Sequence, residues 1–82
     1  MQREEIYKIL NKIFQDVFDD ESIAVYEQMT AADIEEWDSL EQIHLIVSIE
    51  KKFHIKFDME EVSRMKTVGN MADGIWERLN DV

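Results

Sequence analysis

Hydrophobic residues recur at three- and four-residue steps along the first part of the chain, which is the pattern of an amphipathic helix. The pattern predicts a helix over residues 2 to 18. Its apolar positions are Ile6, Ile9, Leu10, Ile13, Phe14 and Val17. Residues 19 to 37 show no sustained period and predict a long loop, with a short turn near residues 30 to 34. Loops of this length in small domains are usually either functional or disordered.

The strongest apolar pattern follows directly after this loop. Asp38 and Glu41 have the spacing of a reciprocal capping box and predict that a second helix begins here. Apolar residues cover more than half of its circumference, so we expect this helix to contact several other elements. These residues are Leu40, Ile43, Leu45, Ile46, Val47, Ile49 and Phe53. The remaining polar stripe lies next to Ser39 and contains Glu41, His44, Ser48, Lys51 and Lys52.

The last third of the chain predicts two more helices. Residues 53 to 57 alternate apolar and polar, but no second strand candidate exists to form a sheet. We expect this segment to link two helices and to insert its apolar side chains in the core. Asp58 opens a short third helix containing Met59, Val62 and Met65, and Thr67 caps a fourth that reaches Leu79. The fold class is therefore all-α: a four-helix bundle with a long loop between the first two helices and a short third helix.

Composition limits the possible functions. The chain has 82 residues, of which 19 are acidic and 9 basic, and we expect a single domain over residues 1–82. A net charge of −10 repels nucleic acid and anionic membranes and favours basic partners. Cysteine is absent, so thiol chemistry would need a sulfur atom supplied by a cofactor. We find neither a signal peptide pattern nor an apolar run of membrane-spanning length, and expect a cytoplasmic monomer.

Ser39 is the candidate functional residue. As a catalytic nucleophile it would need a base within hydrogen-bond reach. His44 lies about 140° away around the helix axis, and His54 lies beyond the far end of the same helix. An enzyme is therefore not expected. As an attachment site, Ser39 stands in the first helical turn, where the dipole and free N–H groups favour a phosphodiester. A serine that merely begins a helix would have the same local sequence.

The arrangement as a whole resembles the acyl carrier protein family over essentially the full length. Asp38, Ser39 and Leu40 match the Asp-Ser-Leu that opens the second helix in that family. Residues 45–53 are similar to its Leu-x-x-x-(Leu/Ile)-Glu-x-x-Phe run, and residues 67–69 match its Thr-Val-Gly segment. The resemblance implies that Ser39 carries 4′-phosphopantetheine, whose terminal thiol holds acyl groups as thioesters and shuttles them between enzymes.

The resemblance also implies two kinds of partner. A phosphopantetheinyl transferase would modify Ser39 from coenzyme A and Mg²⁺, aided by Asp38 and Leu40. Acyl-transferring, synthase or ligase enzymes with basic docking patches would then bind the exposed stripe that contains Glu41 and His44.

The chain departs from the family pattern around Ser39. Glu36 and Trp37 stand where the family usually has glycine and a small residue. Both belong to the candidate partner-binding surface, although Trp37 has an equal alternative as an aromatic ring packed over the loop. His44, Lys51 and Lys52 occupy positions that are often acidic in the family. We therefore expect a discrete, specialised carrier of a fatty acid, polyketide or lipid-related pathway.

Two alternatives stay open at this point. An aminoacyl or peptidyl carrier shares the fold and the modified serine, although its usual glycine-rich flanks are missing here. An acidic helical adaptor without a prosthetic group would explain the charge. This alternative would not explain why Ser39 lies at a capped helix start, or why the apolar residues of the second helix follow the family's order.

Overall fold

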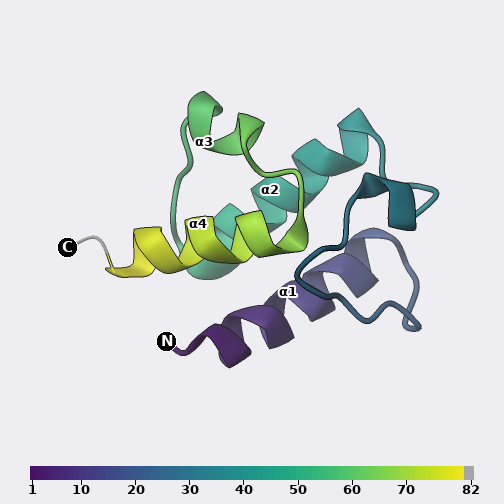
Figure 1. Cartoon of the computed structure of the whole chain (residues 1–82), viewed down its shortest axis with the longest axis horizontal. Helices are drawn as coiled ribbons and strands as arrows, with labels where there is room; N and C mark the ends of the chain where they lie inside the picture. The colour runs from purple at the N-terminus through teal and green to yellow at the C-terminus, as the bar shows by residue number, and fades with distance from the viewer. Residues whose placement is uncertain (81–82) are drawn as a thin grey trace.

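The computed structural model describes residues 1–80, which contain four α-helices and one short 3₁₀ helix joined by loops (Figure 1). The elements are α1 (Arg3–Val17), η1 (Ala31–Asp33), α2 (Ser39–Phe53), α3 (Met59–Ser63) and α4 (Val68–Asn80). The predicted all-α bundle, its long loop and its short third helix are confirmed. Met65 was predicted within the third helix, but it lies beyond the end of α3 and is buried in the link to α4.

Side-chain caps determine where α2 and α3 begin. Asp38 Oδ1 accepts a hydrogen bond from the Glu41 backbone N–H at 2.9 Å, as predicted. The reciprocal half of that capping box is wrong, because the Glu41 carboxylate instead lies 2.7 Å from His44 Nδ1. At α3 both bonds form: Asp58 accepts from the Glu61 N–H at 2.8 Å, and Glu61 accepts from the Asp58 N–H at 3.0 Å. Asp38 thus fixes the helix start directly before Ser39.

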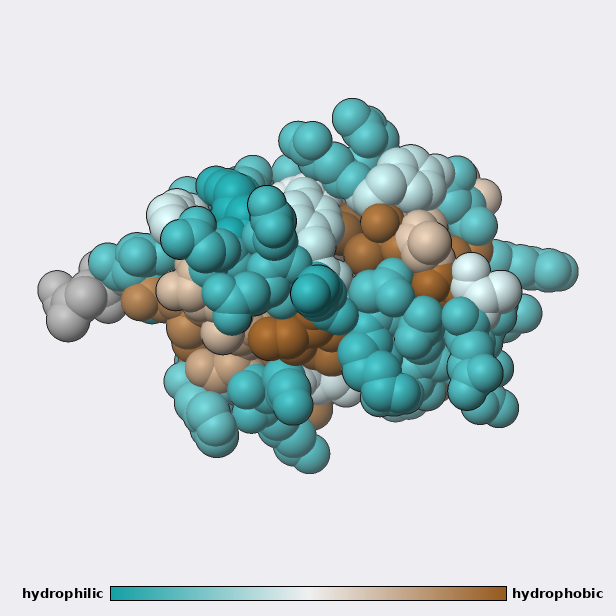
Figure 2. All heavy atoms as spheres, turned by 90° about the horizontal axis from the view of Figure 1, so that it is seen from below, coloured by the Kyte–Doolittle hydropathy of each residue, from teal (hydrophilic) through white to brown (hydrophobic). Residues whose placement is uncertain are grey.

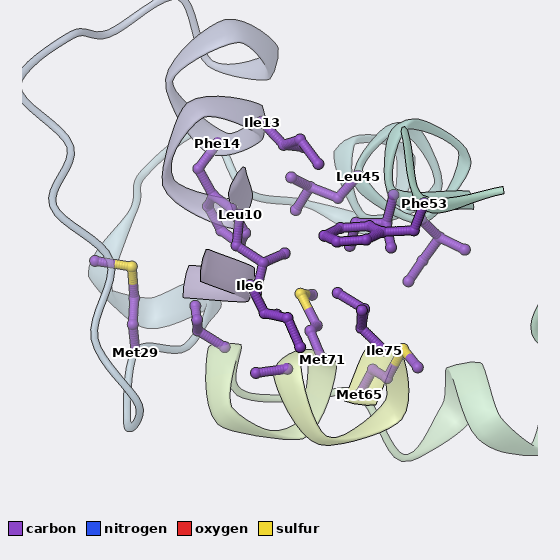
Figure 3. Packing of buried hydrophobic residues seen from close by; sticks show 14 of the residues in the cluster. Ile6, Leu10, Ile13, Phe14, Met29, Leu45, Phe53, Met65, Met71 and Ile75 are labelled. Atoms are coloured by element: carbon purple, nitrogen blue, oxygen red, sulfur yellow. The ribbon is translucent and has the colours of Figure 1, made fainter. Parts of the chain in front are cut away.

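The hydrophobic core lies between α1, α2 and α4 (Figure 3). Leu10 and Phe14 from α1 point toward Leu45 from α2 and Met71 from α4. The largest fully buried side chains are Phe14, Ile6, Leu10, Leu45, Ile49, Met71, Ile75 and Val68. Burying one such side chain contributes roughly 1.5–3 kcal/mol. The three long helices therefore supply most of the stability, and α2 is held as a rigid base for its N-terminal serine.

The long loop between α1 and α2 packs against the start of α4. The Val68 N–H donates to the Met29 carbonyl at 3.0 Å, and the Gly69 N–H donates to the Glu27 carbonyl at 2.9 Å. A Cβ atom at Gly69 would lie only 3.0 Å from that carbonyl oxygen, so glycine permits the close approach. The loop is thereby fixed by α4, and it delivers the chain to Ser39 in a defined position.

Three apolar residues of α2 do not pack as the sequence pattern suggested. Leu40 and Ile43 are each 59% exposed, and Val47 is 41% exposed. The broad apolar arc, from which contacts with several other elements were expected, is therefore left uncovered on this side. The long helix α1 packs on the opposite side, whereas α3 has only five residues and covers little of α2. An apolar strip next to Ser39 is left facing solvent.

The surface is otherwise mostly hydrophilic. Figure 2 shows one face, on which charged and polar side chains surround small apolar areas. Within residues 1–80, no helix is long and apolar enough to cross a membrane.

Candidate functional site at the start of α2

Ser39 is the first residue of α2 and is exposed. Asp38 before it has an extended backbone, with φ −114° and ψ −171°, and its carboxylate is engaged by the Glu41 N–H. The Ser39 hydroxyl makes no hydrogen bond to another residue of the described part of the chain. A serine in this position is accessible from solvent and can be modified without breaking a structural contact.

A broad hollow adjoins Ser39, between η1, the start of α2 and the end of α3. Its volume is about 690 Å³, within the range of small-molecule sites. The lining residues are Thr30, Ala31, Ala32, Trp37, Asp38, Ser39, Gln42, Val62, Ser63, Met65 and Lys66. Most of the exposed lining is carbon, so a flexible chain attached to Ser39 could rest against this hollow.

A hydrogen-bonded bridge beside the hollow joins the loop before α2, the first turn of α2 and the link between α3 and α4. The indole Nε1–H of Trp37 donates to Gln42 Oε1 at 2.6 Å. The Gln42 side-chain amide then donates to the Met65 carbonyl at 3.0 Å. Trp37 is only 6% exposed, and its ring meets Phe14 edge-on with centroids 5.2 Å apart. Trp37 is therefore a packed aromatic ring, the alternative raised from the sequence, and it offers little surface to a partner.

Negative charge surrounds the serine. Asp33, Glu35, Glu36 and Asp38 are all exposed on the segment that leads into α2. One member of this cluster also acts on a tyrosine: local desolvation, together with the Asp33 carboxylate, raises the pKa of Tyr26. Such a cluster attracts positively charged surfaces from a distance.

Neither histidine is placed to activate Ser39. His44 Nδ1 lies 2.7 Å from a Glu41 carboxylate oxygen. His54 is the C-terminal cap of α2, at the opposite end of the helix from Ser39. The structure therefore contains neither a Ser–His hydrogen bond nor a catalytic arrangement around Ser39 within residues 1–80.

The remaining partner-binding candidates divide by exposure. Leu40 and His44 are exposed on α2, and Glu41 is half-buried beside His44. Glu36 and Asp38 are exposed at the N-terminal end of this surface. Gln42, which forms the centre of the bridge described above, was missed, because nothing in the sequence links its amide to Trp37 and to the distant Met65 carbonyl.

Comparison with known proteins covers nearly the whole bundle. Residues 10–75 match the model of a protein family described as the phosphopantetheine attachment site. A curated acyl carrier protein from Acidothermus cellulolyticus is 31% identical over 75 residues, which are 92% of this chain and 89% of that protein. The solution NMR structure of holo acyl carrier protein from Geobacter metallireducens matches with a TM-score of 0.87 and 41% identity. The match covers 92% of this chain and 86% of that one.

Proposed function

Because the chain belongs to the acyl carrier protein family, and so is a carrier with a covalent phosphopantetheine rather than a catalyst, we propose that Ser39 is the attachment residue. The observation that carries this proposal is the exposed Ser39 hydroxyl, without a hydrogen-bond partner in the described structure, at the first residue of α2. The helix N-terminus favours a phosphodiester there by roughly 0.3–1 kcal/mol. When attached, the arm supplies a terminal thiol that holds acyl groups as thioesters.

The residues next to Ser39 make the serine available to a transferase. Asp38 accepts the Glu41 N–H, which keeps the first turn of α2 formed while leaving the Ser39 hydroxyl unengaged. Leu40 is 59% exposed and offers an apolar contact directly beside the reacting hydroxyl. We expect a phosphopantetheinyl transferase to recognise Ser39 through these two neighbours.

Partner enzymes are proposed to dock on the exposed side of α2. Leu40, Ile43 and Val47 provide apolar contact area there. Exposed carboxylates, among them Glu36, lie at the Ser39 end and favour a partner with basic residues around its active-site entrance. A partner bound in this way would receive the acyl group close to its own reacting atoms.

We further propose that residues 1–82 act as one carrier domain in a specialised fatty acid, polyketide or lipid-related pathway, with cytoplasmic partners. The single core shared by α1, α2 and α4 supports the first part. The mixed charge along α2 supports the second, because His44, Lys51 and Lys52 make its exposed side less acidic than the whole molecule. The adaptor alternative is set aside, because the chain belongs to a family defined by phosphopantetheine attachment.

The proposal is tested by intact-protein mass spectrometry. The protein is incubated with coenzyme A, Mg²⁺ and a broad-specificity phosphopantetheinyl transferase, and we expect one phosphopantetheinyl group to be added. Ser39→Ala should take up none, while its melting temperature stays nearly unchanged because the hydroxyl makes no structural contact. A large loss of stability would show that Ser39 is structural. Modification of the variant would place the arm on another residue.

A further inference from the structure

Basic charge gathers at the C-terminal end of α2, although the whole chain carries −10. Lys51 and Lys56 are exposed, and neither forms an ion pair within residues 1–80. Of the nine basic residues, four are paired with carboxylates elsewhere within residues 1–80, and three of the five that form no ion pair there are Lys51, Lys52 and Lys56. In a chain with a large excess of acidic residues, these lysines keep their charge free for another molecule.

A hollow of about 420 Å³ lies among these residues. Val47 and Ile55 give it apolar walls, and Lys51, His54 and Lys56 give it basic ones. Glu50 also lines this hollow, where its carboxylate accepts a hydrogen bond from the Phe57 backbone N–H at 2.8 Å, and the two lysines outnumber this one carboxylate. An apolar side chain flanked by carboxylates would therefore find both an apolar contact and opposite charge here.

His54 adds an independent observation. It caps α2 in the left-handed conformation, with φ 57° and ψ 47°, at a position where glycine is the usual residue. A side chain here brings backbone strain that glycine would avoid. The imidazole at this strained position lines the hollow.

The hollow is continuous with the exposed side of α2 that begins next to Ser39. Leu40, Ile43, Val47 and Lys51 follow one another at steps of three, four and four residues and so share one helix face, which ends near the C-cap residue His54. Ser39 and His54 are about 22 Å apart along the axis. This face is acidic at the Ser39 end, apolar in the middle and basic at the far end.

We propose that the basic hollow at residues 47–56 is a second docking site, which binds an acidic segment with an apolar side chain on the surface of a partner enzyme. The inference rests on the proposed function and specifies the partner: basic near its active-site entrance and acidic about 20 Å away. Because the two ends of α2 have opposite charge, such a partner binds in one direction only. Ser39 then faces the active site, whereas the reversed orientation brings like charges together.

A peptide titration followed by NMR tests the site on the full chain after treatment with transferase and coenzyme A. The probe is a capped peptide with two acidic residues on each side of one phenylalanine. We expect saturable shifts of the backbone amides at residues 51–56, against the overall repulsion of a −10 protein. The double variant Lys51→Glu/Lys56→Glu should weaken binding at least tenfold. Lys8→Glu/Lys12→Glu on α1 changes the net charge equally and should have a much smaller effect.

His54→Gly separates binding from folding. It should weaken peptide binding severalfold while the melting temperature stays the same or rises, since the left-handed strain is removed. The proposal is overturned if residues 51–56 do not shift, or if both double variants weaken binding to the same extent. The titration measures amide shifts at the C-terminal end of α2, and these can be observed whether or not Ser39 is modified. Failure of the attachment proposal is therefore seen in the mass spectrum and is distinct from failure of this one.

Discussion

Trp37 shows how one side chain can organise the surroundings of the attachment site. Its ring packs edge-on against Phe14 of α1, and its N–H binds Gln42 on the first turns of α2. Gln42 in turn holds the Met65 carbonyl in the link between α3 and α4. Through these contacts Trp37 connects the loop before Ser39 with α1, with α2 and with the link between α3 and α4.

Trp37→Phe should destabilise the protein by about 1–3 kcal/mol. Phenylalanine keeps the aromatic contact with Phe14 but removes the N–H, so Gln42 Oε1 loses its donor in a half-buried position. Trp76→Phe is the matched control, because Trp76 is only half-buried and its ring lies 5.3 Å from the Arg3 guanidinium. Urea unfolding measures both variants, and equal costs for the two would argue against a special role for the bridge.

At the residue scale, the sequence predicts what depends on neighbours in the chain. Asp38, Ser39 and Glu41 are close in sequence, so the cap and the exposed hydroxyl could be predicted from spacing. The burial of Trp37 could not, because its contact with Phe14 joins residues far apart in the chain. Even the capping box was only half correct, since His44 competes successfully for the Glu41 carboxylate.

The helix α2 has a buried side and an exposed side that are both apolar. Ile46 is 7% exposed against the core, whereas the next residue, Val47, is 41% exposed. Apolar periodicity alone could not separate these two sides, because it records hydrophobicity and not what covers it. The packing of the other elements decides the outcome: they cover Ile46, whereas nothing within residues 1–80 shields Val47 to the same extent.

Ile46→Ala and Val47→Ala form a matched pair on adjacent positions of α2. Ile46→Ala should lower the free energy of unfolding by about 2–5 kcal/mol, because it leaves a cavity under a helix. Val47→Ala should change it by less than about 0.5 kcal/mol, because Val47 is already 41% exposed and alanine favours helices. Denaturant melts compare the two, and a reversed order would mean that α2 is rotated about its axis.

The short helix α3 is held to α4 by an ion pair. Arg78 Nε donates to Glu61 at 3.0 Å, and a second guanidinium nitrogen bonds the same carboxylate. The Arg78 hydrogen bonds, aided by the Asp58 N–H, keep the pKa of Glu61 below its usual value of 4.5. The stabilisation is therefore complete above about pH 4.5, the usual value, and is lost as the pH falls through the lower pKa of the folded state.

Glu61→Gln should accordingly lower stability by about 1 kcal/mol at pH 7, and this effect should shrink as the pH falls below 4.5 through the lowered pKa of Glu61 in the folded state. Glu60→Gln is the control. Glu60 forms an ion pair with Arg64, but the two side chains are 79% and 66% exposed, so this pair contributes little to stability. Thermal melts across this pH range would show the difference. A Glu61→Gln effect that is constant with pH would mean that shape, and not charge, holds α3 to α4.

At the scale of the whole molecule, the stability gained from a modest hydrophobic core is reduced by repulsion within an excess of acidic residues. Within residues 1–80, sixteen buried hydrophobic residues hold the bundle together, while the excess of 19 acidic over 9 basic residues in the sequence favours mutual repulsion. The bundle architecture and the acidity both followed from the sequence, since each is a sum over many residues. The docking of the long loop on α4 did not follow, because it depends on backbone bonds such as Gly69 N–H to the Glu27 carbonyl.

Self-repulsion should make the protein more stable in salt. Between 20 and 500 mM sodium chloride the screening length shortens from roughly 20 Å to roughly 4 Å, so repulsion between distant carboxylates fades. We expect the melting temperature to rise by about 4–8 °C, which corresponds to about 1 kcal/mol for a domain of this size. Glu35→Gln/Glu36→Gln removes two exposed carboxylates that form no ion pair within residues 1–80. This variant should melt higher at low salt and gain less from added salt. A melting temperature that falls with salt would show instead that attractive pairs such as Arg78–Glu61 outweigh the repulsion.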